Sequence, residues 1–126
     1  MHHDRHWSKD EANAALDRLA PKVRALREHL DHLRSPEVVE RLADAAGEPG
    51  GAYPGYDIAR AAVELAFGLR DLAEQEIVVR DLDRGLIDFP ALRDGREVYL
   101  CWLCGEPEVT HWHEPESGFA GREPLA

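Results

Sequence analysis

The chain has 126 residues, of which 44% are hydrophobic and 32% charged, and its formal net charge is −10. The length predicts a single domain, residues 1–126, with a core large enough to fold without disulfide bonds, and the composition excludes a disordered chain. The acidic balance, with basic residues scattered among carboxylates, excludes a nucleic-acid-binding surface, which needs a cationic stripe.

The expected localisation follows from features that the sequence lacks. No apolar run is long enough to cross a membrane, and the segment MHHDRHW has no apolar signal region. Two cysteines without an export signal indicate a reducing compartment. We therefore expect a cytoplasmic protein with no membrane or nucleic-acid partner, and we assign no role to His2 and His3.

A long helix is predicted first, from a capping box at Ser8 and Glu11. Pro21 predicts a kink there, or a helix end and restart. An apolar stripe with spacings of three and four runs along the helix, and it comprises Leu16, Leu19, Val23, Leu26, Leu30 and Leu33. Such a stripe needs a long partner helix. It is longer than one neighbouring helix usually needs, so we expect a homodimer through helix pairing.

Two further helices complete the helical half, residues 1–76. Pro36 starts a short helix that runs to about Ala46, because proline is tolerated at the first helical position. Residues 47–55, GEPGGAYPG, predict a flexible loop. Asp57 is the expected cap of the third helix, which extends to about Glu76 and supplies the natural partner stripe for the first helix.

Residues 77–113 change to an alternating pattern and predict a four-stranded antiparallel meander. The Asp94-Gly95 turn pairs Asp88 with Cys101, and a five-residue loop pairs Cys101 with His111 and Leu103 with Val109. A turn at residues 83–85 pairs Arg80 with Asp88. The fold class is therefore α+β, with the helices packed on one face of the meander and residues 114–126 forming a wrapping tail.

Strand alternation divides the sheet into two faces. The apolar face, which we expect against the helices, comprises Ile77, Val79, Ile87, Phe89, Val98, Leu100, Trp102 and Trp112. The other face carries polar groups on an apolar surface, namely Arg80, Asp88, Tyr99, Cys101, His111 and His113, with Val78, Leu82, Leu86, Leu103 and Val109 around them. Titratable groups gathered in such surroundings indicate a functional site.

The chemistry that best fits this face is zinc or another divalent metal. Cys101 and Cys104 form a C-x-x-C-G sequence at a hairpin tip, and His111 and His113 supply imidazoles nearby. Other interpretations stay open: Cys101 can be a core residue, and Arg80 and Asp88 can be a simple cross-strand ion pair. A redox role is disfavoured, because these cysteines follow a strand and have no helix N-terminus to lower their pKa.

The chain also resembles a known family over nearly its whole length. The matching stretches are EANAALDRLAP at 11–21, DLDRGLIDFPALRDGREVYLCW at 81–102, GE at 105–106, WHE at 112–114 and GFAGR at 118–122. They resemble an uncharacterised bacterial domain-of-unknown-function family, number 2203, which implies no activity. The family pattern includes residues that match Asp81, Asp88, Cys101, Trp102, Glu106, Trp112, His113, Glu114 and Arg122.

The resemblance changes the expected ligand set. The family generally lacks a cysteine at the position of Cys104, and another residue often stands at the position of His111. The resemblance therefore favours a ligand-binding site made of Asp88, Glu106, His113, Glu114 and Arg122, with the GFAGR tail bringing Arg122 back to the acids.

Three hypotheses follow. The first is a ligand- or metal-binding module that uses the polar cluster. The second is a structural or interaction protein that dimerises through its helices. The third is a small enzyme with His113 as general base; the sequence shows no clear nucleophile or phosphate loop for it, and whether the protein is an enzyme stays open.

Overall fold

The computed structural model describes residues 1–47 and 55–125, in which helices precede an antiparallel sheet. The helices are α1 (Lys9–Leu33), α2 (Pro36–Ala46) and α3 (Tyr56–Glu74). The strands are β1 (Val78–Asp81), β2 (Leu86–Arg93), β3 (Arg96–Leu103), β4 (His111–His113) and β5 (Glu123–Pro124), paired in that order, with the 3₁₀ turn η1 (Phe119–Gly121) before β5. The predicted α+β class is confirmed; the fifth strand, two residues in the tail, was not predicted.

Helix α1 begins as predicted and continues through its proline. The Ser8 side chain accepts from the Glu11 amide while the Glu11 carboxylate accepts from the Ser8 amide, which confirms the capping box. Pro21 lies inside the helix and does not end it. Leu19 and Val23, two residues to either side, are fully buried, and this packing holds the helix together where one backbone hydrogen bond is missing.

The α1 stripe packs against α3 within the same chain and contributes to the core beneath the sheet. The two helices approach so closely that a Cβ atom at Gly68 would overlap the side chain of Leu26. Helix α3 begins at Tyr56 after Gly55, so the prediction that Asp57 caps it was wrong: Asp57 lies in the first turn and pairs with Arg41. The predicted flexible loop, apart from its two end glycines, lies outside the described residues.

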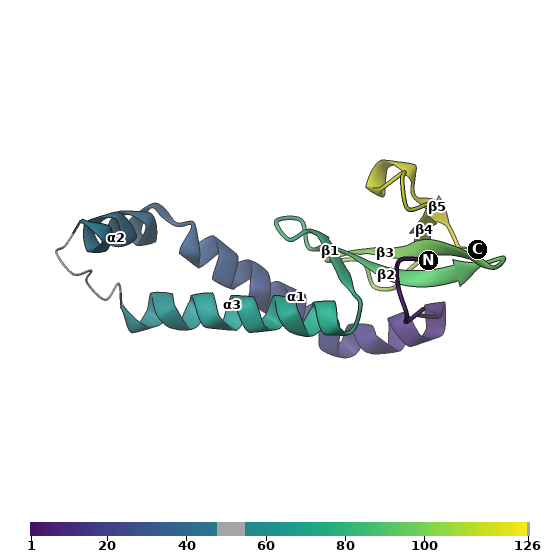
Figure 1. The fold of residues 1–126 in the computed structure, drawn as a ribbon, viewed down its shortest axis with the longest axis horizontal. Coiled ribbons are helices and arrows are strands. Elements are labelled where there is room, and N and C mark those ends of the chain that lie inside the picture. The colour runs from purple at the N-terminus through teal and green to yellow at the C-terminus, as the bar shows by residue number, and fades with distance from the viewer. Residues whose placement is uncertain (48–54, 126) are drawn as a thin grey trace.

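The helices cover one face of the sheet and then project beyond it. Figure 1 shows the first half of α1 beneath the sheet, while the second half of α1, the first half of α3 and α2 extend away as an arm. The core between helices and sheet contains the predicted apolar face, namely Ile77, Ile87, Phe89, Val98, Leu100, Trp102 and Trp112, with Val79 partly buried against it.

The central register of the sheet is as predicted. Asp88 pairs with Cys101, and Cys101 pairs with His111. The predicted pairing of Arg80 with Asp88 was wrong, and Val78 stands opposite Asp88. Asp81 rather than Leu82 pairs with Leu86, and the register shifts once more at an irregularity between Val79 and Asp81.

Two apolar residues also lie elsewhere than predicted. Leu103 does not pair with Val109; instead, the Val109 amide donates to the side chain of Asn13 in α1 at 2.6 Å. Leu82 and Val109 pack with the core rather than on the second face. Both lie in loops, where strand alternation no longer determines the direction of a side chain.

The N-terminal segment is held by the carboxylates of Glu97 and Glu76. Glu97 accepts from the amides of His2 and His3 and contacts the His6 ring at 2.8 Å. Although burial raises the pKa of Glu97, these donors outweigh it and hold the pKa at about 2. Behind them Trp7 is 3% exposed and its amide donates to a sheet carbonyl. The segment therefore fixes the end of α1 against the sheet.

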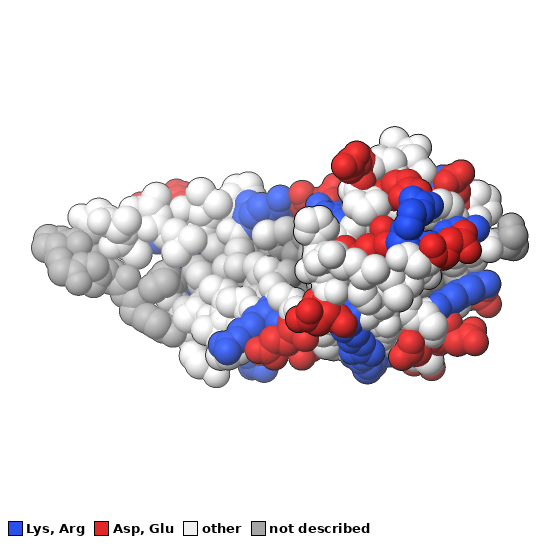
Figure 2. Space-filling model, turned by 45° about the vertical axis from the view of Figure 1, so that its right-hand side comes forward, with Lys and Arg blue, Asp and Glu red and all other residues white. Residues whose placement is uncertain are grey.

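The surface carries charges of both signs. Figure 2 shows acidic and basic side chains interspersed over the sheet end on the face that it presents, with no continuous basic stripe there. Among the described residues, no helix is both long and apolar enough to cross a membrane.

Candidate metal centre

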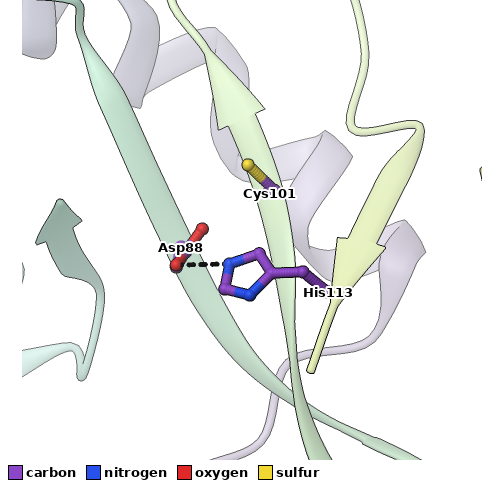
Figure 3. A group of neighbouring side chains, drawn as sticks. All are labelled: Asp88, Cys101 and His113. Atoms are coloured by element: carbon purple, nitrogen blue, oxygen red, sulfur yellow. Dashed lines mark hydrogen bonds and ion pairs between the residues drawn. The ribbon is translucent and has the colours of Figure 1, made fainter. Parts of the chain in front are cut away.

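Three strands bring Asp88, Cys101 and His113 together on the face of the sheet away from the core. Asp88 and Cys101 are cross-strand partners, and His113 lies two positions along β4 from His111, the partner of Cys101. One ligand atom from each of the three lies within 4.8 Å of the others, and Figure 3 shows the three side chains converging. Their exposed fractions are 0%, 0% and 2%.

The two oxygens of Asp88 have different surroundings. Oδ2 accepts from Arg80 Nε and contacts His113 Nε2, both at 2.7 Å, and Figure 3 marks the contact with His113. Oδ1 is buried and has no hydrogen-bond partner among the described residues. The Cys101 thiol also interacts with the Asp88 carboxylate, but a thiol is a weak donor. A buried carboxylate oxygen without a strong donor is costly, so Oδ1 can accept a ligand.

His113 is held in one orientation by its neighbours. Its Nδ1 lies 2.7 Å from the Glu114 carbonyl oxygen, an acceptor, so Nδ1 carries a proton and Nε2 faces Asp88. The ring stacks on Tyr99, with centroids 5.5 Å apart. Burial lowers the pKa of His113, but the hydrogen bonds to Asp88 and to the Glu114 carbonyl outweigh it, and the net pKa is raised.

The thiol of Cys101 is unreactive while no cation is present. Burial, and then the charge of Asp88, raise its pKa to about 12. Because the thiolate is the reactive form, this excludes a low-pKa redox cysteine at Cys101. A metal ion is the partner that can deprotonate such a thiol, because coordination removes the proton outright.

Two of the four residues predicted as metal ligands lie apart from this group. Cys104 follows β3 and packs against the hydrophobic core, because residues three apart on a strand point to opposite faces. His111 shares the face of Cys101 but its Nδ1 contacts the Thr110 hydroxyl at 2.9 Å. Asp88 was predicted as part of the ligand-binding set. It lies beside Cys101 and His113, where Cys104 and His111 were expected.

The remaining predicted residues surround the group in different ways. Arg122 reaches Glu106 with Nη2 at 3.1 Å from both carboxylate oxygens, so the tail returns to the sheet. The side chain of Glu114 lies at the surface and pairs with Arg96. Its contribution to the cluster is the backbone carbonyl that orients His113.

Tyr99 and His3 complete the surroundings of the cluster. The Tyr99 ring lies between His113 and the Arg80 guanidinium, which is centred 4.6 Å from it. The Tyr99 hydroxyl contacts His3 Nε2 at 3.0 Å. Strand alternation predicted Tyr99 on this face. For the contact between the N-terminal segment and the sheet, the sequence offered one signal, an isolated Trp7 in a polar segment.

Comparison with known families gives one match. The profile of a family described as an uncharacterized conserved protein (DUF2203) matches residues 5–125. The chain belongs to this family. The matched range contains all five strands and every residue of the cluster. Comparisons with curated proteins and with solved structures gave no match, so DUF2203 membership brings no activity.

Proposed function

We propose that the protein is a metal-binding module that holds one divalent ion of the zinc type between Asp88, Cys101 and His113. The observation that carries the proposal is the buried Asp88 Oδ1, which has no strong donor among the described residues and lies in a group of three ligating side chains. A cation at this place supplies the missing partner and offsets the cost of a buried, half-satisfied carboxylate.

The donor set fits a divalent ion in charge and in type. Deprotonated Asp88 and Cys101 contribute two negative charges and His113 none, which together neutralise a 2+ ion. A thiolate and an imidazole favour zinc over magnesium or calcium, which take oxygen ligands. The Nδ1 contact of His113 with a backbone carbonyl is the outer support that metal-binding histidines usually have.

Metal analysis of the untagged, full-length protein by mass spectrometry tests the proposal. We expect about one zinc per chain in the wild type, and little or none in Asp88→Asn, Cys101→Ser or His113→Gln. The matched controls are Cys104→Ala and His111→Gln, a second cysteine and a second histidine from the same hairpin, which retain the metal.

Two outcomes contradict the proposal. One is a metal-free wild type that also fails to take up added Zn(II) and melts at the same temperature with a chelator; Arg80, Asp88 and His113 would then be a structural ion-pair network. The other is a metal content that depends on Cys104 and His111 as strongly as on Asp88, which would indicate the Cys101, Cys104, His111, His113 site.

A second candidate function is assembly through the helical arm. Tyr56, Val63 and Phe67 of α3 are 72%, 51% and 64% exposed, and Val39 of α2 is 53% exposed. Spacings of seven and four place the three α3 residues on one face of the helix. We propose that they form a homodimer contact, because apolar side chains gathered on one surface indicate an interaction site. The α1 stripe, in contrast, already has its partner in α3.

A further inference from the structure

Arg122 is the second group near the cluster with an unsatisfied buried atom. Its Nη2 pairs with Glu106, but its Nε is buried and has no hydrogen-bond partner among the described residues. Arg122 comes directly before β5 and has extended backbone angles. Because Glu123 pairs with Trp112, continuing the same register places Arg122 opposite His113. The charges of Arg122 and Glu106 both act on the pKa of Cys101, the first lowering it and the second raising it.

Three protein ligands leave a coordination position open. Structural zinc sites are closed by four protein ligands, whereas sites with three keep the fourth position for water or another ligand. Among the described residues, the group of potential ligands at this place has three members, Asp88, Cys101 and His113.

The charges around the occupied centre leave an excess of one positive charge. A 2+ ion is neutralised by Asp88 and Cys101, and Arg122 is neutralised by Glu106, but Arg80 adds one charge through its contact with Asp88. The Arg80 side chain is 38% exposed, so solvent screens part of its charge, but the three ligating side chains are buried, where an unbalanced charge is unfavourable. A singly charged anion in the open position brings the sum to zero.

We propose that the open metal position binds a small carboxylate, which coordinates the ion through one oxygen and accepts a hydrogen bond from Arg122 Nε. The inference rests on the metal-binding function proposed above. Arginine is suited to this role because its planar guanidinium can bind Glu106 through one nitrogen and a second carboxylate through another. The ligand class is a small organic acid, because the three ligating side chains are no more than 2% exposed.

Titration of the Co(II)-loaded, full-length protein with acetate tests this inference. Co(II) replaces zinc in such sites and its visible absorption reports the ligands of the ion. We expect acetate to change the spectrum in a saturable manner, while chloride at equal ionic strength does not. The double variant Glu106→Gln/Arg122→Gln, which removes the pair without leaving a lone charge, weakens acetate binding about tenfold or more and leaves Co(II) binding unchanged.

Arg70→Gln/Glu74→Gln is the matched control, since it removes an arginine–glutamate pair on the surface of α3 and should respond to acetate as the wild type does. If the Glu106/Arg122 variant does not fold, Arg122→Lys keeps the charge, lacks Nε in that geometry and should also weaken acetate. Bound Co(II) without an acetate response, or an equal response in the Arg122 variants, overturns the inference alone. Failure to bind Co(II) overturns the metal-binding function as well.

Discussion

The chemistry of the cluster depends on how protons are held at Cys101 and His113. Burial and the Asp88 charge raise the pKa of the Cys101 thiol to about 12. The hydrogen bonds of His113 to Asp88 and to the Glu114 carbonyl overcome the effect of burial and raise its pKa. Both shifts favour the protonated forms of these ligands in the metal-free protein, so an ion must displace their protons to bind.

Zinc affinity should therefore rise with pH. While Cys101 and His113 both hold a proton, the apparent Kd falls about hundredfold for each pH unit, and above the raised pKa of His113 it falls about tenfold. Competition with a chelator of known affinity between about pH 6 and pH 9 measures this slope. An affinity that does not change over the range contradicts the assignment of these two ligands.

The Asp88–His113 contact should also stabilise the metal-free protein in a pH-dependent manner. Since the folded pKa of His113 is raised, this stabilisation is fully present below the unfolded pKa of about 6.5 and is lost as the pH rises through the folded pKa. His113→Gln leaves Asp88 with Arg80 alone, and should cost about 3 kcal/mol at pH 6.

Urea denaturation of the wild type, His113→Gln, Asp88→Asn and the double variant forms a mutant cycle that isolates the contact. The double variant should lose clearly less free energy of unfolding than the sum of the single variants, because the pair is removed together. Additive losses at pH 6 would contradict direct coupling of the two side chains.

At the scale of the elements, the close approach of α1 and α3 depends on Gly68. A glycine inside a helix usually costs about 1 kcal/mol relative to alanine, but here a Cβ would overlap Leu26, which is 3% exposed. Glycine at this position therefore lowers the helix propensity of α3 but allows a tight contact between the two helices.

Gly68→Ala should therefore lower the free energy of unfolding by about 1 kcal/mol, the strain of overpacking less the gain in propensity. In a Leu26→Ala background the sign should reverse, because the space is then free and only the propensity gain of about 1 kcal/mol is left. Urea denaturation of the four proteins gives both values. A stabilising effect in the wild-type background would contradict the tight packing.

At the scale of the whole molecule, charged and apolar surfaces lie in different parts. The sheet end carries interspersed charges in Figure 2, whereas much of the arm on that face is uncharged. Phe67, 64% exposed, lies on α3 and Leu92, 51% exposed, at the end of β2. Comparing these two positions separates a specific contact of the arm from general hydrophobic association.

Light scattering at micromolar concentration should give the mass of a dimer for the wild type. Phe67→Glu should give a monomer, because it places a charge in the apolar contact at a cost of about 2 kcal/mol or more, while Leu92→Glu should stay dimeric. A monomeric wild type contradicts the proposed assembly, and an equal effect of both substitutions contradicts its location on the arm.

The local sequence determined the central part of the sheet and therefore much of the candidate site. A two-residue Asp94-Gly95 turn allows only one register between β2 and β3, and strand alternation then places Asp88 and Cys101 on one face. These relations connect residues close in the sequence, so turn chemistry and periodicity are sufficient to predict them. The capping box at Ser8 was predictable for the same reason.

Only the tertiary structure decided which hydrogen-bond partner each polar side chain of this face contacts. Arg80 and His113 take one oxygen of Asp88 and leave the other free, and Arg122 returns from the tail with an unsatisfied Nε. These contacts join segments that are far apart in the chain or displaced by the irregularity in β1. Their geometry depends on how the side chains pack in the complete fold. No periodicity or residue spacing in the sequence predicts such packing.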